Sequence, residues 1–169
     1  MKKSLLIIAV CAGLCSANAY SQNLKLGHIN STQLLTFMPE TKVADSALQK
    51  FGSSLESQLK TMNAEYESKI NEYKKDDASM AEPIRSARIK EITDLEDRIQ
   101  DFQQSAQQSI QKKKEELYSP IIKKADEAIK TVAKDKGYSY IFDSSVGVLL
   151  YAMEGDDIMA LVKTKLGLK

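Results

Sequence analysis

The sequence is poor in the residues from which catalytic and metal sites are usually built. It contains one histidine, His28, and two cysteines, Cys11 and Cys15. A structural zinc site normally takes four Cys or His ligands, and a Ser-His-acid triad would have to use the single histidine. Neither a G-x-S-x-G nucleophile elbow nor a G-x-x-x-x-G-K-[ST] phosphate loop is present. We therefore expect no enzyme activity, metal or cofactor, and interpret His28 as an ordinary strand residue.

Tryptophan is absent, glycine is scarce, and neither sign of charge is in clear excess. The chain has 24 basic and 23 acidic side chains. Opposite charges are interleaved along most of the sequence, which is typical of solvated helix surfaces. Because no basic field extends over the chain, the sequence does not favour nucleic acid as a partner.

The chain begins with a short apolar stretch. Lys2 and Lys3 precede the mostly apolar residues 4–14, and Ala17 and Ala19 are small residues where a signal peptidase reads them. Eleven residues are too few to span a bilayer. We predict that residues 1–19 are a signal peptide that is removed, so that the exported chain contains no cysteine.

Between residues 40 and 136, apolar side chains recur at steps of three and four, which predicts two long helices. Asp, Ser and Pro83 interrupt the pattern at 76–83. The two stripes align head to tail, because the residue numbers of facing pairs such as Leu59 and Phe102 sum to 161. We predict an antiparallel helical hairpin, or arm, with its tip near 76–83. The predicted seam residues are Phe51, Leu55, Leu59, Met62, Tyr66, Leu95, Ile99, Phe102, Ala106 and Ile110.

The remaining residues, 20–39 and 137–169, are predicted to form a small body. Alternating side chains predict strands starting near Leu24 and after Gly137, a further strand is expected at 148–152, and each half carries a short helix. Pro39 and Pro120 fall at the same level of the arm, where we predict its root and a kink. The fold class is thus α+β, mainly α. Three short strands leave unpaired edges, which favours an oligomer.

Basic side chains gather near the predicted tip, together with one flexible methionine. Acidic residues, among them Asp76 and Asp77, lie between them, so a solvated surface is the simpler interpretation of most of these charges. Contact with an anionic lipid or with a bound polypeptide is the alternative. The candidate residues are Lys74, Lys75, Met80, Arg85 and Arg88.

The order of these features resembles the Skp/OmpH family of periplasmic chaperones over nearly all of the exported chain. The resemblance rests on L-G-H-I-N-S-T-Q-L-L at 26–35, on the long hairpin, and on the segment from K-D-K-G-Y-S-Y-I-F-D to M-A-L-V-K-T-K-L-G at 134–167. One departure is that members are often markedly basic, whereas this chain is nearly neutral.

The resemblance implies a periplasmic homotrimer with a barrel-like body and three arms around a cavity. It implies an ATP-independent holdase that binds unfolded outer-membrane proteins and prevents their aggregation. A structural coiled-coil adaptor or spacer of the cell envelope, binding a folded partner, is the alternative. The predicted oligomerisation residues are Leu26, Ile29, Tyr140, Phe142, Leu149 and Tyr151.

Overall fold

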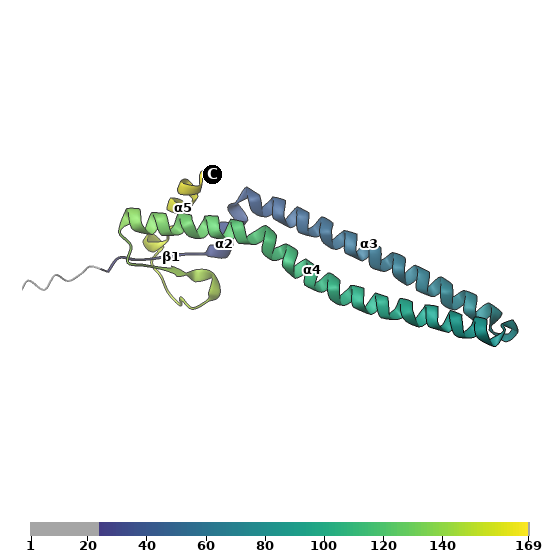
Figure 1. Ribbon diagram of the computed structural model, residues 1–169. Helices are drawn as coiled ribbons and strands as arrows, with labels where there is room; N and C mark the ends of the chain where they lie inside the picture. Colours follow the sequence, from purple (N-terminus) through teal and green to yellow (C-terminus); the bar gives the residue numbers. More distant parts are fainter. Residues whose placement is uncertain (1–23, 169) are drawn as a thin grey trace, which may run out of the picture.

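The computed structural model describes residues 24–168, which form a small body and a long arm (Figure 1). The predicted signal peptide, residues 1–19, lies outside the described residues. Within 24–168 no helix combines the length and the apolar character needed to cross a membrane. In chain order the elements are β1 (Leu26–Ile29), α2 (Ser31–Phe37), α3 (Pro39–Asp76), η1 (Asp77–Ser79), α4 (Glu82–Lys136), β2 (Tyr140–Asp143), η2 (Ser144–Val146), η3 (Glu154–Asp156) and α5 (Met159–Leu166).

Helices α3 and α4 run in opposite directions and form the arm, which confirms the predicted hairpin (Figure 1). The chain reverses through η1 and the two residues that follow it, inside the predicted tip. Across the arm, Lys69 Nζ lies 3.2 Å from Glu91 Oε2. Nearer the body, the Tyr118 hydroxyl donates a hydrogen bond to Asp45. The residue numbers of the two pairs sum to 160 and 163, so the helices pair within a few residues of the predicted sum of 161.

Proline and glycine mark the ends and the bend of the arm helices. Pro39 is the first residue of α3, and Pro83 lies in the first turn of α4, where its missing N–H removes no helical hydrogen bond. Gly137 ends α4 with a left-handed backbone (φ 69°), and its amide donates to the Lys134 carbonyl at 3.2 Å. Pro120 lies inside α4. The helix continues past it but changes direction between arm and body (Figure 1), as an interior proline causes.

The body is built on a parallel pair of strands. Leu26 of β1 lies opposite Tyr140 of β2, and Ile29 lies opposite Asp143. Parallel strands need a long crossover connection, and the whole arm serves as that connection. The amide of Ile158 donates to the His28 carbonyl at 3.0 Å, which ties the start of α5 to β1.

The hydrophobic core is shared between the body and the root of the arm. Side chains from β1, α2 and α5 pack against the last four turns of α4 and the first turns of α3. This packing sets the direction in which the arm leaves the body, because the same helices form both parts. The buried core residues are Ile29, Leu34, Met38, Ala44, Ile121, Ala125, Ala128, Val132, Ile158 and Val162.

The predicted strand at 148–152 is wrong for the single chain. These residues are outside any helix or strand. Leu150 is 97% exposed and Tyr151 is 82% exposed. A strand needs a neighbour to pair its backbone N–H and C=O groups. Within residues 24–168 the sheet consists of β1 and β2, and the segment pairs with neither of them, so its alternating apolar pattern has no partner in the single chain.

Candidate interaction surfaces

An apolar surface on the body, which we call the body patch, surrounds β2 and the segment after η2. The rings of Tyr140 and Phe142 stack with centroids 6.5 Å apart, and both side chains are exposed. Isolated exposed apolar residues are ordinary on a protein surface, but several of them within residues 140–153 make this segment a candidate interaction surface. The body patch comprises Tyr140, Phe142, Val146, Val148, Leu150, Tyr151 and Met153.

The structure places the predicted oligomerisation residues in three different environments. Leu26 and Tyr151 are exposed, as are the two stacked rings of β2. Leu149 is half-buried. Ile29 is only 2% exposed and packs in the core of its own chain. We therefore leave Ile29 out of the candidate assembly surface, because a side chain buried in its own protomer cannot contact another.

Asp143 anchors the body patch to the rest of the body. Its Oδ2 accepts a hydrogen bond from the Ser31 hydroxyl at 2.5 Å, and its Oδ1 accepts from the amides of Ser31 at 3.2 Å and Ser145 at 2.9 Å. Burial by itself raises the pKa of this carboxyl, but the hydrogen bonds from Ser31 and Ser145 outweigh it and lower the pKa to about 2. The end of β2 is thereby held as an anion against the start of α2.

His28 contributes to the same anchoring and to no recognisable catalytic arrangement. Its Nε2 donates to the Met153 carbonyl over 3.4 Å, which links β1 to the end of the body patch. Among residues 24–168, no cluster of three His, Cys, Asp or Glu side chains is arranged to hold a metal ion. The position of His28 is that of a strand residue whose side chain fastens a loop.

The predicted seam residues lie along the facing sides of α3 and α4 to different depths. Leu95 and Ile99 are buried, and most of the others are half-buried. Ile110 is 37% exposed. The seam is therefore more tightly closed at Leu95 and Ile99 than at Ile110.

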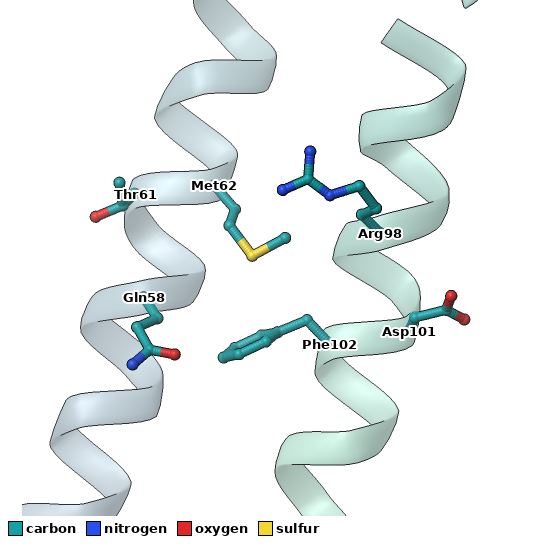
Figure 2. Close-up of a pocket in the computed structure, with 6 residues that line it drawn as sticks. All are labelled: Gln58, Thr61, Met62, Arg98, Asp101 and Phe102. Carbon is teal, nitrogen blue, oxygen red and sulfur yellow. The ribbon is translucent and has the colours of Figure 1, made fainter. Parts of the chain in front are cut away.

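A groove of about 520 Å³ opens beside the seam, midway between root and tip. Figure 2 shows Met62, Arg98 and Phe102 projecting into the space between the two helices, with Thr61 and Asp101 at its outer edges. The apolar stripe predicts Met62 and Phe102 here. It does not reveal the polar residues that border the groove. Each of these polar residues is next in sequence to an apolar residue of the stripe, and this adjacency is the sequence signal that predicts them. The lining residues are Gln58, Thr61, Met62, Arg98, Asp101 and Phe102.

At the tip, two of the predicted basic side chains lie close to glutamates of the same helix. Arg88 forms an ion pair with Glu91 at 3.5 Å, and Arg85 lies 4.0 Å from Glu82. The side chains of residues 74 and 75 are exposed at the end of α3, and Met80 is half-buried. The Arg88 pair is exposed, and pairs of this kind contribute little stability, so Arg88 remains accessible to a ligand, whereas Arg85 is half-buried.

The comparisons with known proteins agree with this architecture. A family model described as "Outer membrane protein (OmpH-like)" matches residues 25–166. The chain is 25% identical over 146 residues to "Chaperone protein Skp" of Vibrio cholerae, covering 86% of each chain. It is 24% identical over 163 residues to "Chaperone protein Skp" of Photorhabdus luminescens, covering 96% of this chain and 97% of that protein.

A solved structure shows the same fold at lower sequence similarity. An OmpH-like protein from Caulobacter crescentus superposes with a TM-score of 0.74 at 13% identity, covering 85% of this chain and 83% of that one. At this identity the likeness concerns the fold, and the family match spans nearly the whole described chain. The protein therefore belongs to the Skp/OmpH family of OmpH-like outer membrane proteins.

Proposed function

We propose that this protein is an ATP-independent holdase chaperone of the periplasm that binds unfolded outer-membrane proteins. Membership of the family supports the proposal, as does the name "Chaperone protein Skp" that its relatives carry. The observation that carries it is the arm itself. Between Ala44 and the tip, no described side chain of α3 is fully buried. The arm therefore presents half-exposed apolar side chains along much of its length, which suits many weak contacts with an unfolded chain.

We propose further that three copies assemble through the body patch. The patch belongs to residues 140–153, and its most exposed member is Leu150. Pairing of the 148–152 segment with a neighbouring protomer would satisfy its backbone groups and cover its side chains. Three bodies joined in this way would direct three arms to one side and enclose a cavity. Export by the N-terminal signal peptide completes the proposal.

To test the function, an unfolded β-barrel membrane protein is diluted from urea in the presence of this protein and without nucleotide. Light scattering measures its aggregation. We expect one trimer per client to suppress the scattering. Undiminished aggregation at a threefold excess of trimer would reject the holdase. A single folded partner captured from an envelope extract, together with indifference to unfolded chains, would instead support the adaptor.

The tip is a candidate contact for anionic lipid. Residues 74–90 carry five basic and three acidic side chains, and the attraction of such a segment to an anionic membrane falls with salt. Flotation with vesicles of anionic lipid tests this, and zwitterionic vesicles serve as the control. Replacement of Lys74 and Lys75 by Gln is expected to abolish a lipid-specific signal. Equal flotation with both lipids would exclude the contact.

A further inference from the structure

The negative charge of the arm is concentrated in one zone below the tip. We call this zone the acidic collar. It consists of residues 56–73 of α3 and 91–101 of α4. In the register set by Lys69 and Glu91, the α4 residues face the middle of the α3 range. It holds nine acidic and three basic side chains, a net charge of −6, in a chain whose total is +1. At about 1.5 Å per residue, the collar extends over about 27 Å of the arm.

The groove between the helices lies inside this collar. Met62 and Phe102 provide its apolar surface. Asp101 also lines the groove, on its outer side, and its carboxylate points away from the space between the helices (Figure 2). Two more acids lie one helical turn away, Glu65 after Thr61 and Asp97 before Asp101. Glu65, Asp97 and Asp101 are all exposed, and within the described part of the chain none of them forms an ion pair. An apolar surface is thus bordered by carboxylates that are free to pair with a ligand.

Charge complementarity selects the occupant of this groove. At physiological ionic strength exposed charges act over about 8 Å, so neighbouring carboxylates in the collar reinforce one another. A polypeptide segment with Lys or Arg beside apolar side chains gains both kinds of contact. Its aliphatic stems and apolar groups lie on Met62 and Phe102, and its cationic ends reach the carboxylates. An acidic segment of equal apolar content is repelled. Arg98 is the single basic residue of the groove lining and weakens this preference without reversing it.

We propose that the acidic collar and its groove bind basic, apolar-containing segments of unfolded polypeptides in preference to acidic ones. This selectivity rests on the proposed holdase function and names the class of segment that the middle of the arm holds. It also separates two zones of the arm, because the tip above the collar carries a net positive charge.

The test uses the full-length exported protein and two fluorescent 20-residue peptides with the same apolar residues, one carrying four lysines and the other four glutamates. At low salt we expect at least about tenfold tighter binding of the lysine peptide, and a preference that largely disappears in 0.5 M salt. The triple variant Glu65→Gln, Asp97→Asn, Asp101→Asn is expected to lose most of the preference. Arg98→Gln is expected to increase it.

A matched control removes the same amount of charge elsewhere. Glu115, Glu127 and Glu154 are exposed, lie outside the collar and form no ion pair within residues 24–168. Their replacement by Gln is expected to leave the preference intact. Equal affinity of the wild-type protein for both peptides, or an equal loss in the control variant, would overturn the inference. If the protein suppresses β-barrel aggregation but binds both peptides equally, the charge preference is rejected and the holdase stands. If it prefers the lysine peptide but does not suppress aggregation, the holdase is rejected and the charge preference stands.

Discussion

At the scale of single residues, Asp143 has the clearest structural role. It is the only described acid whose pKa falls to about 2, and the groups that bind it come from α2 and η2. The folded pKa lies below the value of 3.8 expected for an unconstrained Asp. The ionised form is therefore favoured by folding, and its stabilising contribution is present above about pH 4 and disappears as the pH falls towards 2.

Asp143→Asn is expected to lower the free energy of unfolding at pH 7 by about 1–2 kcal/mol, because the amide cannot hold the charge-assisted bond to the Ser31 hydroxyl. The difference from wild type should shrink between pH 4 and pH 2. Urea unfolding at a series of pH values measures both effects. Asp156→Asn is the control, and a difference that stayed constant down to pH 2 would contradict the account.

Gly52 offers the opposite kind of change. It lies inside α3 with a free space where a Cβ would be placed. Gly52→Ala is expected to stabilise the protein by about 0.5–1 kcal/mol, because alanine loses less backbone entropy in a helix. Gly137→Ala should instead destabilise it by about 1 kcal/mol, since φ there is +69°. Thermal unfolding measures the midpoint temperature of both variants. Midpoint shifts of the same sign would contradict the roles given to the two glycines.

At the scale of elements, the arm is held unevenly along its length. Leu95 and Ile99 are its buried side chains between the root and the tip, while Ile110, nearer the root, is 37% exposed. A two-helix arm has a single seam, so each buried residue contributes a large share of its stability. The body differs because β1, α2, α4 and α5 cover one another from several sides.

Leu95→Ala is expected to cost the arm about 2–4 kcal/mol, because a nearly fully buried leucine is replaced and the helices have little other packing with which to close the gap. Hydrogen exchange should report faster opening of α3 and α4 around this level and little change in β1 and β2. Ile84→Ala, at a side chain that is 55% exposed, provides the comparison. Similar protection in both variants would argue against Leu95 as the centre of the seam.

At the scale of the whole molecule, the single chain has an arm anchored in a well-packed body and a body patch left uncovered. The patch carries no formal charge and is rich in aromatic and aliphatic groups, which is the composition of the buried centre of an interface. The arm is charged, and the burial of its apolar side chains varies along its length, which is the character of a surface that contacts many chains in turn. Under the proposed function, assembly and client binding would therefore use different parts of the fold.

Leu150→Asp is expected to reduce the mass in solution from three chains to one, because a charge at the most exposed apolar position of the body patch would be buried on assembly. Light scattering coupled to size exclusion measures the mass. Val43→Asp introduces the same charge at an exposed position on the arm and should leave the mass unchanged. A wild-type protein with the mass of one chain would remove the basis of the cavity.

The elements that could be predicted are those whose signal is local. The hairpin follows from apolar spacing within each helix, and its tip follows from residues 76–83. The cap of α2 is local in the same sense, since the Asn30 side chain accepts from the amide of Gln33, three residues away, at 2.8 Å. By contrast, the strand expected at 148–152 failed because alternation indicates a pleated segment but does not supply its partner. The polar border of the groove was missed because the stripe considered apolar residues alone.

By itself, the sequence determined the two arm helices, their antiparallel pairing to within a few residues and the place where they reverse, because helical periodicity repeats every few residues and needs no distant partner to be recognised. Only the tertiary structure decided the parallel pairing of β1 with β2, the anchoring of Asp143 by Ser31, the burial of Ile29 in its own chain and the groove within the acidic collar. These features depend on contacts between residues separated by tens of positions along the chain, and such contacts exist only once the arm has folded and brought the two ends of the body together.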